Sequence, residues 1–132
     1  MKSKLILAVA GAVALSGLTA YAHHSFTATY QEDEILTIEG TLVQFMYRNP
    51  HSFVHVMAPD ENGTMQRWGV EWGGAGQLGA QGVQRDSLRA GDHVVVTGPP
   101  SRNRRDHRML LRYLERPSDG FTYGRDPNQT FD

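Results

Sequence analysis

Short stretches in which apolar and polar residues alternate, separated by turn residues, are the feature that most constrains the fold of this chain. The longest runs from Ile35 to Arg48 and ends at Asn49-Pro50, because proline lacks the donor that a sheet ladder needs. The alternation changes phase near Thr41, next to Gly40, which indicates a bulge or a sharp curl in the strand. The pattern is typical of a mainly β protein.

Four further segments are predicted to be strands: residues 52–58, 65–73, 93–98 and 108–116. For the last of these the periodicity fits a short helix as well, but a partner for the preceding strand favours a strand. A glycine-rich connection between the third and fourth strands has room for one short helix around residues 77–84, or a loop. Five strands with a curled first strand predict a small OB-like barrel. A β-sandwich is the alternative, although it usually needs about seven strands.

The first residues predict a secretory signal peptide. Lys2 and Lys4 precede an apolar stretch, and Ala20-Tyr21-Ala22 has the small residues that signal peptidase requires. The apolar stretch is shorter than the roughly 20 residues that span a bilayer, so we expect cleavage after Ala22 and no membrane span afterwards. The expected organisation is a signal peptide (1–22), an N-terminal arm (23–34), the OB-like domain (35–116) and a polar C-terminal tail (117–132).

The composition after cleavage limits the function classes. The remaining 132 − 22 = 110 residues are enough for one domain, and the chain has no cysteine for disulfides or thiolate ligands. Both lysines lie in the leader, so eleven arginines oppose fourteen acids, giving 11 − 14 = −3 with neutral histidines. A general nucleic-acid binder needs a basic surplus, so nucleic acid is not an expected partner.

Cleavage after Ala22 would give His23 a free α-amino group. That amine and the imidazole Nδ1 of the same residue can close a chelate ring on one metal ion. A nitrogen from His51, in the turn between the first two strands, would complete a three-nitrogen set, and His24 is an additional candidate ligand. Nitrogen-rich tetragonal sets suit Cu(II), so the sequence predicts a metal site with copper as the favoured ion.

The other histidines give weaker signals. His55 alternates with valines along a strand and fits a half-exposed position, and His93 fits the surface. His107 stands among arginines that would repel a metal ion, so it is not a candidate ligand.

The sequence contains no G-x-S-x-G motif and no convincing carboxylate pair for hydrolysis, so an enzyme is not the favoured hypothesis. A copper-dependent oxidase or oxygenase is least favoured, because nothing in the sequence marks a substrate pocket.

Two tryptophans support an alternative function. Trp68 and Trp72 alternate onto one face of the third strand, where such residues are more often core than ligand platform. If they form a platform, the chain is a non-catalytic accessory module that binds a periplasmic protein or a small polar ligand on the barrel face.

Four blocks follow one another along the chain: "AHHSF" (22–26), "NPHSFVHV" (49–56), "W-x-V-E-W-G" (68–73) and "DSLRAGDHVVVTGPPSRN" (86–103). In these blocks and in their order the chain resembles a family of small exported bacterial proteins that is catalogued as a domain of unknown function. The resemblance implies a periplasmic β-barrel-like domain and no established activity. The arginine-rich "SRNRRDHR" (101–108) departs from the loop typical of such proteins, so no ligand role transfers to it. The His-His after the leader also resembles, as a local motif only, the first-residue histidine of copper-brace proteins.

Overall fold

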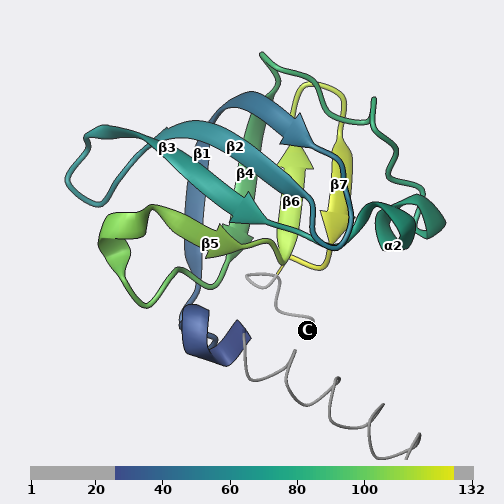
Figure 1. Ribbon diagram of the computed structural model, residues 1–132. Coiled ribbons are helices and arrows are strands. Elements are labelled where there is room, and N and C mark those ends of the chain that lie inside the picture. The colour runs from purple at the N-terminus through teal and green to yellow at the C-terminus, as the bar shows by residue number, and fades with distance from the viewer. Residues whose placement is uncertain (1–25, 127–132) are drawn as a thin grey trace, which may run out of the picture.

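The computed structural model describes residues 26–126, which form a single seven-stranded mixed sheet (Figure 1). Its strand order is β5-β3-β2-β1-β4-β6-β7; β3 and β5 are parallel, and every other neighbouring pair is antiparallel. The prediction of a mainly β protein is therefore confirmed. The strands are β1 (Leu36–Met46), β2 (Phe53–Pro59), β3 (Met65–Glu71), β4 (His93–Gly98), β5 (Arg108–Leu110), β6 (Tyr113–Arg116) and β7 (Phe121–Gly124).

The long strand β1 is shared between the two halves of the sheet. Residues 36–41 pair with β4, whereas residues 41–46 pair with β2, and the register shifts between Leu42 and Gln44. A Cβ added to Gly40 would lie 2.0 Å from the carbonyl oxygen of Met57, so only glycine fits where β1 and β2 approach this closely. The irregularity predicted near Thr41 is present.

The connection between β3 and β4 contains the short helix α2 (Ala75–Ala80), at one end of the sheet. Its side chain Leu78 is fully buried in the core. The single hydroxyl proton of Tyr47 is shared between the carbonyl oxygens of Ala75 and Val83, at 2.8 and 3.0 Å, which attaches the start of α2 and the chain just after it to the segment after β1. The structure thus has a helix in the predicted place, beginning two residues earlier than expected.

The predicted five-stranded OB-like barrel is wrong in its strand count and its closure. The expected strand 108–116 divides, so that β5 pairs with β3 and β6 pairs with β4. The two residues between them explain the division, because the Leu111 amide donates to the carbonyl of Glu71 and the Arg112 amide donates to that of Thr97. The expected polar tail also contributes a strand, β7. The sheet is not closed into a barrel, and the described residues form one hydrogen-bonded sheet rather than the two of a sandwich.

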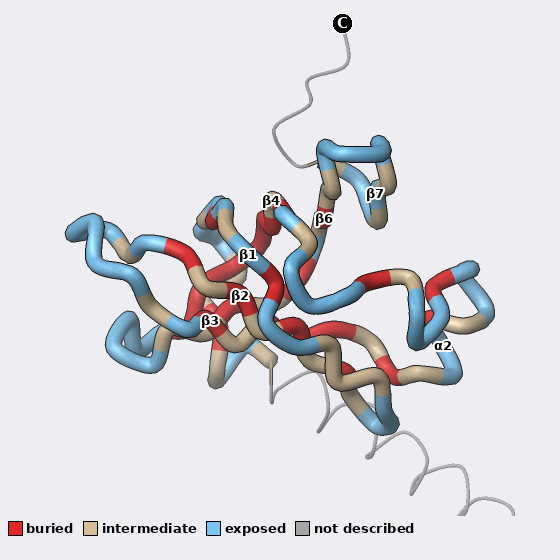
Figure 2. Tube along the Cα trace, turned by 90° about the horizontal axis from the view of Figure 1, so that it is seen from above, coloured by how far each residue is buried: buried red, intermediate tan, exposed pale blue. Residues whose placement is uncertain are grey.

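Alternation along the strands builds one hydrophobic core. Figure 2 shows the buried stretches concentrated along the middle of the sheet and the exposed ones in the connecting loops. Burying such side chains contributes about 25 cal/mol per Å² of apolar surface removed from water. The core includes Leu42, Val54, Val56, Trp68, Val70, Trp72, Leu78, Val94, Val96, Met109 and Leu114.

The described part of the N-terminal arm is attached to the sheet and is not simply extended. Residues 26–29 are helical, and Tyr30 forms a β-bridge with Ser101. The Gln31 amide donates to the carbonyl of Pro100 at 2.8 Å. The predicted cleavage site, His23 and His24 lie outside the described residues. Within residues 26–126, no helix is long and apolar enough to cross a membrane.

Candidate functional site

His51 lies in the turn between β1 and β2, next to the end of β3. Two hydrogen bonds place this turn: the amide of Ser52 donates to the carbonyl of Gly73, and the amide of Trp72 donates to that of Ser52. The imidazole Nδ1 of His51 consequently lies 2.6 Å from Oε1 of Glu71, the last residue of β3. A neutral imidazole has one N–H and one lone pair. When Nδ1 donates to the carboxylate, the lone pair remains on Nε2, the atom through which a histidine held this way binds a metal.

The Glu71 carboxylate is itself held by two further side chains. Its side chain is only 12% exposed, and its second oxygen accepts a hydrogen bond from the hydroxyl of Tyr30. Arg108 on β5 brings Nη2 to 3.3 Å from the same oxygen and to 3.4 Å from the tyrosine hydroxyl. Burial and the neighbouring carboxylate raise the pKa of Tyr30 above its ordinary value, so the hydroxyl keeps its proton. The tyrosine is therefore a hydrogen-bond donor that orients the carboxylate.

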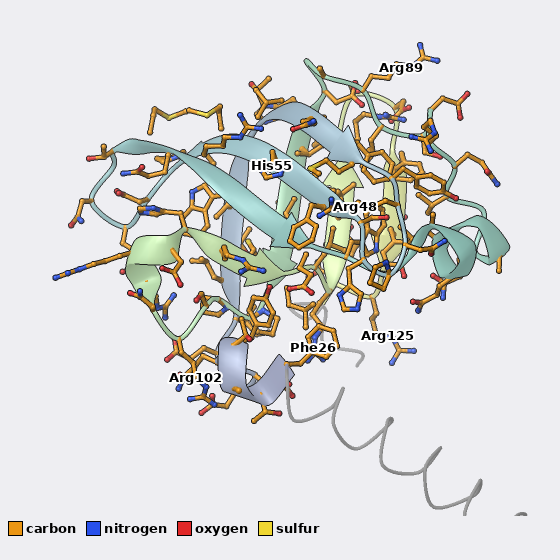
Figure 3. The ribbon with its side chains drawn as sticks, in the orientation of Figure 1. Phe26, Arg48, His55, Arg89, Arg102 and Arg125 are labelled. Carbon is orange, nitrogen blue, oxygen red and sulfur yellow. The ribbon has the colours of Figure 1, made fainter. Side chains whose placement is uncertain are left out.

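Phe26, the first described residue, lies against the imidazole of His51. Its ring stacks on the imidazole of His51, with 5.5 Å between ring centroids and 12° between planes. It also stacks on Tyr30, with centroids 6.4 Å apart. Figure 3 shows Phe26 at the side of the sheet from which the N-terminal arm approaches. His51 thus lies between the carboxylate of β3 and an aromatic ring three residues after His23.

An open pocket of about 480 Å³ adjoins these side chains. The side chain of His51 is 38% exposed, which is enough for a ligand to reach the imidazole. The pocket is polar at Glu71 and aromatic at Phe53, over which the Arg48 guanidinium carbon lies 5.5 Å from the ring centroid. Its lining residues are Arg48, Asn49, Pro50, His51, Phe53 and Glu71.

The remaining described histidines do not join this cluster. His93 on β4 pairs with Glu39 on β1 at 2.7 Å, and both side chains are exposed to solvent. His107 lies 3.7 Å from a carboxylate oxygen of Asp60 and packs edge-on against Trp68. Within residues 26–126, no three histidine, cysteine, aspartate or glutamate side chains are grouped so as to hold a metal ion. His51 is the described member of the predicted set, and the other two members precede Phe26.

Trp68 and Trp72 are both 4% exposed and belong to the core. Their surroundings differ. Trp68 forms the wall of a pocket of about 290 Å³ beside His107, Arg104 and Arg105. Trp72 packs between aromatic rings, with 4.7 Å to the centroid of Tyr123. The two tryptophans share the buried face of the sheet, and Trp68 borders the pocket of about 290 Å³.

Sequence patterns did not indicate that three further residues lie together with His51: Tyr30, Glu71 and Arg108. Alternation along 65–73 does place Glu71 on the face opposite the tryptophans, which was the only available signal. Its partner lies 20 positions away and Tyr30 lies 41 positions away, and no periodicity reports such separations.

The fold and the site together define a small single-sheet β protein with a carboxylate-held histidine beside its N-terminal arm. The chain belongs to a family of unknown function (DUF6152), whose model matches residues 11–109 of the 132. That match contains the cluster around His51 and the whole of strands β1 to β4. No curated protein and no solved structure is significantly similar to the chain.

Proposed function

We propose that the protein is exported to the periplasm, loses residues 1–22, and binds a metal ion, Cu(II) in preference, at the new N-terminus. His23 supplies its α-amine and its ring nitrogen, and His51 supplies Nε2 as a third nitrogen. His24 is a further imidazole next to the set. The role is binding, carriage or sensing of the metal rather than turnover of a substrate.

The position of His51 carries the proposal. A metal-binding histidine commonly donates its other ring N–H to a carboxylate, which fixes the tautomer and makes the ligand more basic. The 2.6 Å contact between Nδ1 and Glu71 is of this kind, and Tyr30 and Arg108 hold the carboxylate in turn.

The reach of the chain also favours the set. The Phe26 ring is stacked on His51, and three residues of chain span at most about 10 Å, at about 3.3–3.6 Å each. So short a connection keeps residue 23 in the neighbourhood of His51, as the proposed donor set requires.

The choice of copper follows from the donor set. Three nitrogen donors and no thiolate suit Cu(II), which is also first in the affinity order of the divalent ions. All three donors must be deprotonated, and the reference pKa of an α-amine is about 7.7–8.0, so binding should weaken as the pH falls.

A titration with Cu(II) tests the proposal. The chain beginning at His23 is compared with the same chain carrying one additional alanine ahead of that residue. The additional residue converts the amine into an amide and should lower the affinity at least tenfold. His51→Ala should also lower it, whereas His93→Ala, which removes an exposed histidine paired with a glutamate, should not. Equal affinities for the two chains would refute the N-terminal chelate.

One observation favours the second candidate, a non-catalytic accessory module. The pocket against Trp68 combines an indole wall with charged groups of both signs, as a small polar ligand or a polar protein segment requires. Arg104 is already paired with Glu61 on the pocket wall, so Arg105 is the arginine to test. In this case a chain that fails to bind Cu(II) should still capture a periplasmic partner, and Arg105→Gln should weaken that capture. Undiminished capture by the variant would remove this pocket from consideration.

A further inference from the structure

A second pocket lies on the solvent-facing side of the sheet, over the middle of β3. In the pairing of the strands, Gly69 is opposite His55 on β2 and opposite Arg108 on β5. These three residues therefore form a row across three strands on one face. The central position has no side chain, so the imidazole and the arginine border a floor of bare backbone.

The space above Gly69 is open. A Cβ built there would lie 3.7 Å from Cγ of Arg108 and 3.9 Å from Cε1 of His55, which are ordinary contact distances. The pocket has a volume of about 270 Å³, just below the usual range of about 300–1,000 Å³ for ligand sites, so only a small molecule fits. Its lining residues are Phe53, His55, Arg67, Gly69, Asp106 and Arg108.

The charges around this pocket are predominantly positive. Arg67 on β3 and Arg108 on β5 line the pocket. Arg48 lies close enough for its charge to affect the pKa of the His55 imidazole. The pKa of His55 is lowered, first by burial and then by the charges of Arg67 and Arg48. Figure 3 shows Arg48 and His55 over the same face of β2 and β3.

Two carboxylates face the region, and both already have partners. Asp106 accepts hydrogen bonds from Asn103 at 2.9 Å and from Ser101 at 3.4 Å. Glu71 is bound to His51, Tyr30 and Arg108 as described above. Three arginines therefore exceed the two acids, even when His55 is neutral.

Phe53 adds an apolar wall. Its ring lies 5.7 Å from the guanidinium carbon of Arg108 and 6.5 Å from the ring of His55. Stacking against an aromatic face leaves the edges of a guanidinium available for an oxyanion, and a guanidinium carries five N–H donors. The single bond from Arg67 to Gln44 leaves donors of that group for a ligand.

We infer that this pocket binds the oxyanion group of a small molecule, held above Gly69 by His55, Arg67 and Arg108. The ligand is a small carboxylate or an inorganic oxyanion. In the first case its apolar part packs against Phe53. This pocket adjoins the proposed metal site and shares Arg108 with it, since that arginine also contacts Glu71, but binding in the pocket does not require a metal.

The test is a titration of the metal-free chain from His23 onward, observed by NMR, with sulfate in one arm and benzoate in the other. Saturable shifts of the Gly69 amide and the His55 ring signals are expected. Tighter binding of benzoate identifies the ligand class as an aromatic carboxylate, and tighter binding of sulfate identifies it as an inorganic oxyanion. The absence of saturable shifts with either probe would overturn the inference.

Two variants separate a built pocket from general attraction to arginine. Arg67→Gln should lower the affinity about tenfold, the loss expected for one charged hydrogen bond. Gly69→Val keeps every charge and fills the floor, so it should lower the affinity by a similar factor. Arg89→Gln removes an arginine far from the pocket and should change nothing (Figure 3). Equal losses for Arg67→Gln and Arg89→Gln would overturn the inference, and thermal unfolding checks that each variant is folded.

Discussion

Nδ1 of His51 lies 2.6 Å from the Glu71 carboxylate, and an almost identical distance, 2.7 Å, separates His93 from Glu39. The two pairs differ in their surroundings. The Glu71 side chain is 12% exposed and that of Glu39 is 62% exposed. Water screens an exposed pair, which contributes little, whereas the partly buried carboxylate fixes its histidine in one orientation. The exposed His93–Glu39 pair is therefore a matched control for the His51–Glu71 pair.

Glu71→Gln should weaken binding of Cu(II) by about 10-fold to 100-fold, because an amide supports the ligand histidine less well than a carboxylate. The measurement is isothermal titration of the chain beginning at His23. Glu39→Gln makes the same substitution in the exposed pair and should leave the affinity unchanged. If the two variants lose the same affinity, Glu71 does not support a ligand.

Phe26→Ala should weaken Cu(II) binding without changing the fold of the sheet. The ring holds the arm against His51, so its removal leaves more freedom to be lost when the metal binds. The control is Phe121→Ala, which removes a ring on β7 that lies against the guanidinium group of Arg116 on β6. Competition with a copper chelator reports both affinities. Unchanged affinity in Phe26→Ala would show that the arm reaches the site without this contact.

Tyr30→Phe should change how stability depends on alkaline pH. The pKa of Tyr30 is raised above 10.0 by burial and by Glu71. Above about pH 10 the unfolded chain loses this proton while the folded chain keeps it, so the free energy of unfolding falls as the pH rises. The variant lacks the group and should lose less stability between about pH 9 and about pH 11. Urea unfolding at several pH values measures this, and parallel curves for the two proteins would contradict it.

The same substitution should cost stability at neutral pH. It removes a hydrogen bond to a partly buried carboxylate, for which about 1–3 kcal/mol is usual. Urea unfolding at pH 7 gives the value directly. A variant as stable as the original would show that Arg108 alone satisfies that carboxylate oxygen.

Gly40→Ala should destabilise the fold by about 3 kcal/mol or more, because the added methyl would lie 2.0 Å from a backbone oxygen of β2. Gly69→Ala is the matched control, since its methyl would meet nothing closer than 3.7 Å. Denaturant midpoints of the two variants provide the comparison. Similar midpoints would mean that β1 and β2 can move apart to make room for the methyl group at little cost in the free energy of unfolding.

The sequence predicted the parts of the fold that local patterns determine. Alternation and turn residues identified β1 to β4 with small errors at their ends, and a shift of phase indicated the irregularity in β1. The division of 108–116 could not be predicted in this way. Leu111 and Arg112 fit a continuous strand, and only their hydrogen bonds to Glu71 and Thr97 direct the chain from one neighbour to another.

The candidate site was predictable to a similar extent. Histidine chemistry indicated His51, because its position in a turn suggested a side chain held at the edge of a sheet. The support from Glu71 depends on the contact between two strand ends that lie far apart in the sequence. His23 and His24 stay predictions, since both precede the described residues.

The arrangement around β5 also affects how the protein behaves at high concentration. An uncovered edge strand offers free backbone groups to another molecule and so promotes aggregation. Here the edge strand has three residues, and the segment 99–101 covers it: the Ser101 amide donates to the carbonyl of Arg108, and the Leu110 amide donates to that of Pro99. The covering segment begins with two prolines, which have no amide hydrogen to offer to an additional strand. This edge of the sheet is thereby protected against joining a second copy of the chain.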